Sequence, residues 1–300
     1  SSFMNVTYIG CFIYTAACET MSPLASTFNA EHNRENLIEL LKTALLYGCI
    51  GSILLGIVIA VFADPVASMF GLNNAISVSA IRAYCISISF TAFVEISACF
   101  YQAIEKPKAA GIITLLRNFI ILFPISAIIG IYWTQYFWYA LPAEEILTAL
   151  AASFVIFKAI PEEDENVFSY TLTNDQKDVS RLLSQVEDYL EQSDSGIKQS
   201  YVISMVVEEL CSAIIEHAFK NDPEEYIQLT ITPEETGNIV VNIRDSAVSF
   251  NPFEMQTKRL NVDSASDHAA IDAMGILMIK KAKEFYYRRY QGFNVTTIIV

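Results

Sequence analysis

Charged residues are scarce in this chain, and basic residues are the scarcest. Only 17% of the 300 residues are charged while 53% are hydrophobic, a balance unlike that of an ordinary soluble domain. The 19 Lys/Arg are outnumbered by 33 Asp/Glu, which gives a net charge of −14. Clusters of basic side chains are what nucleic acid and anionic lipid headgroups select, so both partners are disfavoured. A membrane protein without a nucleic acid partner is the favoured class.

Paired cysteine motifs are also missing. None of the six cysteines forms a CxxC pair, and five of them lie in apolar runs, where cysteine usually acts as a small hydrophobic residue. The sequence therefore predicts neither a disulfide framework nor a zinc site. The six are Cys11, Cys18, Cys49, Cys85, Cys99 and Cys211.

The first residues lack both an initiator methionine at position 1 and the basic region of a signal peptide. An apolar run begins almost at once. We therefore expect the sequence to be the C-terminal part of a longer chain.

Long hydrophobic runs fill the first half. Residues 43–63 carry no charge, lie between Lys42 and Asp64, and can cross about 30 Å of hydrocarbon as a helix. Five such runs within 157 residues favour a transmembrane helical bundle over the alternative, a buried soluble bundle. The expected spans are residues 3–24, 43–63, 77–101, 109–133 and 138–157.

Basic residues mark alternate connections between these spans. The connections 64–75 and 132–140 have none, whereas the other connections and the end of the last span do. By the positive-inside rule we expect a multi-pass protein of the plasma (inner) membrane, with the chain from residue 158 onward in the cytoplasm. The basic residues concerned are Arg34, Lys42, Lys106, Lys108 and Lys158.

The pattern changes after an acidic linker at 158–167. Residues 1–157 hold 6 Lys/Arg and 9 Asp/Glu (net −3), and the rest of the chain holds 13 and 24 (net −11). Alternating and helical apolar periods then predict an α/β sandwich with a mixed sheet over 168–300. Its expected elements are a strand at 167–173, helices at 174–193, 198–219 and 273–283, and hairpins at 226–245, turning at Gly237, and 284–300, turning at Gln291-Gly292.

Four segments of the apolar half resemble one transporter family. They are "CETMSPLASTFNAEHNRENLIELLKTALLYG" (18–48), "FADPVASMFGLNNA" (62–75), "FYQAIEKPKAAGIITLLRN" (100–118) and "ALPAEEILTALAA" (140–152). In this order they resemble helices eight to twelve of multidrug and toxic compound extrusion (MATE) transporters. On this resemblance residues 1–157 are most of a C-terminal lobe, and the N-terminal lobe and helix seven of the same chain are missing.

The MATE resemblance implies export of amphipathic, often cationic, compounds in exchange for H⁺ or Na⁺. A carboxylate inside a span is costly unless it is protonated, paired or facing a cavity, and such acids can carry the coupling ion. The alternative is that each acid merely reaches the interface or caps a helix. The candidates are Glu19, Glu95, Glu144 and Glu145, with Arg82 and Arg117 as possible partners.

The second half carries three ordered motifs. They are Glu209-x-x-x-Ala213-x-x-x-His217, "RDSAVSFNP" (244–252) and "MGILMI" (274–279), followed by "YYRRYQGFNVTTI" (286–298). They resemble the histidine-kinase-like (GHKL) ATPase fold, in particular the anti-sigma-factor kinases. A MATE transporter with such a C-terminal domain is a known bacterial arrangement, so the two resemblances support each other.

The resemblance assigns roles to individual residues. Glu209 would polarise the nucleophile, Asp245 would accept the adenine amino proton in the turn that also holds Asn251, and Gly275 would lie near the phosphates. Ala213 stands where the family has an Asn oxygen for Mg²⁺, which needs hard oxygen ligands, so no metal ligand is expected there. Ala247 replaces a glycine that gives room or φ freedom beneath the base. The plain alternative is that Glu208, Glu209 and Glu216 form a solvated helix face.

Two functions follow. The first is an ion-coupled efflux antiporter in membrane lipid whose eroded domain binds ATP or a regulatory protein, with Mg²⁺ doubtful. The alternative is a membrane-anchored signalling protein whose domain is an active serine kinase of the anti-sigma type, and Ala213 favours the first.

Overall fold

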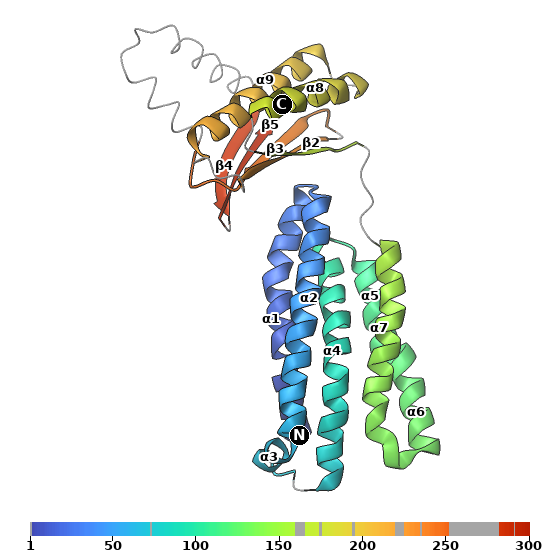
Figure 1. The fold of residues 1–300 in the computed structure, drawn as a ribbon. Helices are drawn as coiled ribbons and strands as arrows, with labels where there is room; N and C mark the ends of the chain where they lie inside the picture. Colours follow the sequence, from blue (N-terminus) through green and yellow to red (C-terminus); the bar gives the residue numbers. More distant parts are fainter. Residues whose placement is uncertain are drawn as a thin grey trace. The chain divides into compact units, whose positions relative to one another are not determined.

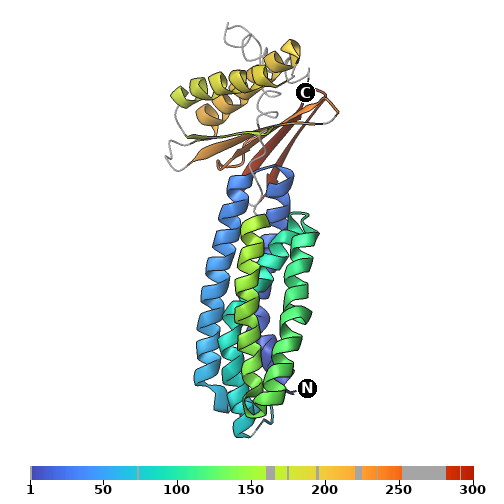
Figure 2. The same ribbon diagram turned by 90° about the vertical axis from the view of Figure 1, so that its right-hand side faces the viewer.

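The protein forms two compact units, Ser1–Glu162 and Glu163–Val300, each described here by itself (Figures 1 and 2). The computed structural model describes residues 2–72, 74–159, 166–173, 176–193, 196–219, 225–234, 236–251, 282–290 and 292–300.

The first unit is helical throughout its described length. Asparagine caps begin two of its long helices: Asn33 accepts the Asn36 N–H, and Asn74 accepts the Ser77 N–H. Its elements are α1 (Ser2–Ala30), α2 (Arg34–Val61), α3 (Ala63–Met69), α4 (Ala75–Ala103), α5 (Pro107–Leu115), the π-helix η1 (Leu116–Ile121), α6 (Leu122–Tyr132), the 3₁₀ helix η2 (Thr134–Tyr139) and α7 (Ala140–Ala159).

Four helical stretches within the described residues are long and apolar enough to cross a membrane, by length and composition. They correct the expected count of five, because the first expected span, 3–24, forms α1 but is not among them. Its hydroxyl side chains, Glu19 and Pro23 lower its hydropathy. The four stretches are Arg34–Val61, Ala75–Ala103, Pro107–Tyr132 and Thr134–Ile156.

Small residues let α2 and α4 approach closely, and α1 packs against both helices (Figure 1). Gly48, Ser52 and Gly56 follow each other at four-residue spacing and are buried on α2. A Cβ atom on Gly56 would lie 3.0 Å from the backbone carbonyl oxygen of Cys85. Large apolar side chains such as Leu54 and Val61 are exposed instead. Small residues at the interface and large apolar ones outside are typical of helix packing in lipid.

We predict that Gly56→Leu separates α2 from α4 and destabilises the helical unit by roughly 2 kcal/mol or more, because a backbone carbonyl cannot move aside. Thermal unfolding of the chain in detergent measures the effect. The matched change Gly111→Leu should have little effect, since nothing lies within 4 Å of a Cβ there. Equal stability of the two variants would contradict the packing argument.

The described residues of the second unit form a five-stranded sheet with α8 (Gln176–Gln192) and α9 (Ile197–His217) on one face (Figures 1 and 2). All described strand pairs are antiparallel, so the expected mixed sheet is corrected to an antiparallel one. The reason is that β1 and β2 run in opposite directions although two helices connect them. In sheet order, the strands are β1 (Phe168–Thr173), β2 (Tyr226–Pro233), β3 (Ile239–Asp245), β5 (Phe293–Ile299) and β4 (Glu284–Tyr290).

A hydrophobic core fills the space between the helices and the sheet. Ile231, Val241 and Ile298 lie in register across β2, β3 and β5 and are buried with Leu182 and Leu210 from the helices. The turns contain Gly237 and Gly292 at φ +80° and +90°, as a glycine turn allows. Most of the helix expected at 273–283 lies outside the described residues.

Candidate functional site

Arg117, in the π-helix η1, joins acids from two other helices. Its Nε and Nη2 donate to Oε1 of Glu145 on α7 at 3.0 and 2.7 Å, and its Nη1 donates to Oε1 of Glu95 on α4. Short π-helical turns often occur at functional sites. One guanidinium therefore ties together three segments of the membrane unit.

The two acids of α7 are more deeply buried than Arg117. Glu144 and Glu145 are 4% and 5% exposed, whereas the side chains of Arg117 and Glu95 are 22% and 40% exposed. The Thr148 hydroxyl donates to Oε1 of Glu144 at 3.1 Å. Oε2 of Glu145 is buried and has no hydrogen-bond partner in the described part of the chain. The site is thus an acid-rich cluster with a single guanidinium.

Three of the four acids expected in the spans meet at this cluster. Glu19 does not, because it is exposed on α1. Arg82 pairs instead with Asp64 at 3.2 Å, where both side chains are more than half exposed. Thr148 was missed from the sequence, although its spacing of four from Glu144 on a helix could have indicated it.

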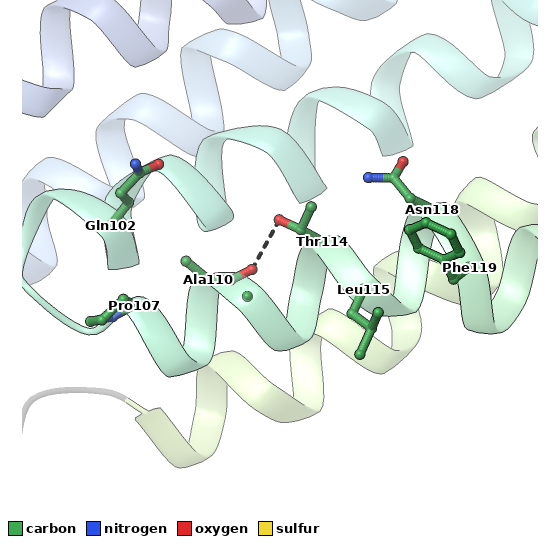
Figure 3. A pocket seen from close by; sticks show the side chains of 8 residues that line it. Gln102, Pro107, Ala110, Thr114, Leu115, Asn118 and Phe119 are labelled. Carbon is green, nitrogen blue, oxygen red and sulfur yellow. Dashed lines mark hydrogen bonds between the residues drawn. The ribbon is translucent and has the colours of Figure 1, made fainter.

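A groove of about 400 Å³ lies elsewhere on this unit, between the end of α4 and the face of α5 and η1 (Figure 3). The Thr114 hydroxyl in it donates to the Ala110 carbonyl at 3.0 Å. None of the lining side chains is ionisable, so the groove suits apolar groups rather than a coupling ion. The lining residues are Gln102, Pro107, Ala110, Gly111, Thr114, Leu115, Asn118 and Phe119.

In the second unit Asp245 lies at the end of β3 and is 2% exposed. Its Oδ1 accepts the Ala247 N–H at 3.1 Å and an N–H of the Asn294 amide at 2.7 Å. Asn294, on β5, is fully buried. Its Oδ1 accepts the Tyr287 hydroxyl and the Arg289 guanidinium of β4 at 2.7 and 2.8 Å. Asn294 of β5 therefore holds the Asp245 carboxyl directly, and Tyr287 and Arg289 of β4 hold Asn294 in place.

Burial raises the pKa of Asp245 to about 6, against the hydrogen bonds from Asn294 and Ala247, which lower it. Burial also raises the pKa of the Cys211 thiol on α9 to about 12, and the charge of Asp245 adds to that shift. This electrostatic interaction places the middle of α9 near Asp245.

Only some of the other residues expected to bind nucleotide lie in the described part of the chain. Glu209 and Ala213 are half-buried and one turn apart on α9. Ala247 is buried in the hydrophobic core and does not have a positive φ, so no glycine conformation is required there. Asn251 is partly buried beyond the turn, and Gly275 lies outside the described residues. On α9, Nε2 of His217 lies 3.8 Å from Oε2 of Glu216.

Two family models match the chain. Residues 1–128 match the MatE family, and residues 172–300 match the histidine kinase-like ATPase domain. The chain joins a MatE region to a histidine kinase-like ATPase domain. No curated protein matches it.

Solved structures similar to the chain are distant. The RsbU and RsbW domains of a Mycobacterium tuberculosis protein are 13% identical with a TM-score of 0.33, over 44% of this chain and 31% of that chain. The SiaB–SiaC complex of Pseudomonas aeruginosa is 14% identical with a TM-score of 0.33, over 52% and 99%. A histidine kinase domain from Erythrobacter litoralis is 11% identical with a TM-score of 0.28, over 64% and 92%.

The family matches divide the candidate residues. Glu19, Glu95 and Arg117 lie in the MatE match, whereas Glu144 and Glu145 lie beyond its last matched residue and reach the cluster through α7. The match to the ATPase domain contains Asp245 and its partner Asn294, as well as Glu209, Ala213 and Gly275.

Asp245 predicts a pH dependence of folding for the ATPase unit. Its folded pKa of about 6 exceeds the ordinary value of 3.8, so the native state keeps a proton that the unfolded chain releases. This contribution is full below about pH 4 and is lost as the pH rises through 6, a change of about 3 kcal/mol. Asp245→Asn should remove it.

Denaturant unfolding of residues 158–300 between pH 4 and 7.5 measures this contribution. The control is Asp188→Asn, which removes the same charge from an exposed position on α8. Its pH profile should follow that of the unmodified unit. Parallel profiles for Asp245→Asn and the unmodified unit would contradict the assignment.

Proposed function

We propose that the protein is an ion-coupled efflux antiporter whose ATPase-type domain regulates it. The substrate class is amphipathic organic cations, exchanged for H⁺ or Na⁺. The observation that carries the proposal is the cluster of Arg117 and Glu95 with the buried Glu144 and Glu145 in a MatE-type membrane unit. Intramembrane acids of this kind are rare and generally serve ion pathways.

Glu19 is a further candidate in this function. It is exposed on α1 in a unit of mostly apolar helices, so it suits an aqueous cavity rather than a buried pair. From the basic connections we infer that the ATPase-type domain lies in the cytoplasm, where ATP and regulatory proteins are available.

We assign the ATPase domain a regulatory role with weak adenine binding. In this proposal Asp245, whose carboxyl group is held by Asn294, contacts the base together with Asn251 and Gly275, and Glu209 is the candidate catalytic carboxylate. Ala213, one turn from Glu209, has no side-chain oxygen, so a Mg²⁺ ion for phosphoryl transfer would lack a protein ligand at this position. The same residue weighs against the second candidate function, a signalling protein with an active serine kinase domain.

The transport proposal predicts that Arg117→Ala abolishes efflux, because it leaves Glu145 buried without a counter-charge. The natural protein in efflux-deficient bacteria should lower the accumulation of ethidium, and Glu145→Gln and Glu19→Gln should impair this. The matched control Arg82→Ala breaks only an exposed pair and should keep efflux at equal expression. If all variants and the empty vector accumulate the dye alike, the protein does not transport it.

The regulatory proposal predicts weak ATP binding and negligible hydrolysis by residues 158–300. Loss of a positioned metal removes several kcal/mol of transition-state stabilisation, and each 1.4 kcal/mol is about tenfold in rate. Calorimetric titration with and without Mg²⁺ and phosphate release measure the two properties. Ala213→Asn should make binding depend more strongly on Mg²⁺. Rapid Mg²⁺-dependent hydrolysis by the unmodified unit would favour the kinase function instead.

A further inference from the structure

Two carboxylates on α7 are buried, and only one of them contacts a guanidinium. Arg117 contacts Glu145, whereas Glu144 forms no salt bridge with the Lys, Arg or His side chains in the described part of the chain. Glu95, the other partner of Arg117, has 40% of its side chain exposed, so it is not buried as the two acids of α7 are. If Glu144 and Glu145 were both ionised, one negative charge would remain buried without a counter-charge. Such a charge is strongly unfavourable inside a membrane.

The hydroxyl of Thr148 makes an unusual hydrogen bond to Glu144. Several hydroxyls on these helices donate to the backbone carbonyl four residues earlier, which is a common choice on a helix. Thr148 instead donates to the carboxyl group of Glu144, although a carbonyl lies four residues earlier on α7 as well. The ordinary cases include Thr20, Thr27, Thr91, Ser97, Thr114 and Ser153.

One carboxylate oxygen of Glu145 accepts no hydrogen bond from the described residues. Arg117 occupies its Oε1 with two N–H groups, while its Oε2 is buried and lacks a partner within the described residues. A buried acceptor without a partner is costly and requires an explanation, and a proton on the carboxyl group is one such explanation. Within the described residues, Glu144 thus lacks a cationic partner and the next residue, Glu145, has a carboxylate oxygen that lacks a hydrogen-bond donor.

We propose that Glu144 and Glu145 hold one proton between them at neutral pH, with Arg117 as their fixed counter-charge. A single proton makes the buried group of Glu144, Glu145 and Arg117 neutral, and Oε2 of Glu145, which accepts no hydrogen bond from the described residues, is an atom that can carry it. The inference deepens the proposed function, because it makes the coupling ion a proton and assigns it to α7. No bond other than O–H forms or breaks.

The surroundings of the pair contain few other titratable groups. Arg117 on η1 and Tyr84 on α4 interact electrostatically with Glu145, Tyr14 on α1 interacts with Arg117, and Glu95 on α4 reaches the pair through Arg117. The other elements packed on α7 are α5, α6 and η2, and their described residues contribute no charged contact to the pair. A pH change near neutrality would therefore alter the protonation of Glu144 and Glu145 themselves.

Infrared difference spectroscopy of the chain in lipid vesicles tests this directly. As the pH is raised from neutral, the carbonyl band of one protonated carboxyl group should disappear. Glu144→Gln and Glu145→Gln should each lack this band, because the remaining carboxylate can ionise against Arg117. Arg117→Gln should double the band at neutral pH, since both acids then need a proton. Thr148→Val should shift its frequency while keeping its amplitude.

Controls separate this inference from misfolding and from failure of transport. Glu39→Gln removes an exposed acid and should leave the band unchanged. A band that survives in both α7 variants, or no band in the folded unmodified chain, would overturn the proposal. Loss of the band on adding Na⁺ at constant pH would replace the proton with a metal ion. The band requires no transport, so a protein with the band but without efflux would refute only the proposed function.

Discussion

The guanidinium of Arg117 imposes the constraint on which the interior of the membrane unit depends. A cation placed among apolar helices must find carboxylates, and Arg117 finds them on α4 and α7, which lie 22 and 28 residues away along the chain. Apolar contacts between lipid-immersed helices are weakly specific, because lipid is as apolar as the side chains. The charged hydrogen bonds therefore set the register of η1 against α4 and α7. The small residues of α2 then determine how closely α4 approaches from the other side.

In the described part of the ATPase unit, the buried acid Asp245 accepts hydrogen bonds from neutral donors and not from a guanidinium. Asp245 is held by the amide of Asn294 and the N–H of Ala247, while Arg289 and Tyr287 contact Asn294 rather than Asp245. Neutral donors orient a carboxyl group without fixing its charge, and this is why burial can raise the pKa of Asp245 to about 6. In the membrane unit a full positive charge contacts Glu145 directly, so an additional proton is needed only because Glu144 is a second acid beside it.

The sequence predicted elements whose period or turn chemistry is local. The apolar runs gave the helices from α2 onward, and Gly237 and Gly292 gave the turns of both hairpins. It also named Glu95, Glu144 and Glu145 as well as Arg117. It left the choice between Arg82 and Arg117 open, because pairing across 28 residues depends on helix packing that no local pattern encodes. The sheet was expected to be mixed, since strand direction after two helices is likewise a tertiary property. Asn294 was missed because its role exists only where β5 lies beside β3.

The hydrogen bonds of Asp245 also limit what its presence implies about ATP. The carboxyl group satisfies the buried Ala247 N–H and one N–H of Asn294, so replacing it would leave two donors unsatisfied in the core. Folding alone is therefore a sufficient reason for an aspartate at this position, whether or not a nucleotide binds. Ala213 is half-buried on α9, and no comparable structural requirement appears there. The identity of residue 213 therefore bears on the proposed loss of phosphoryl transfer more directly than the presence of Asp245 bears on adenine binding.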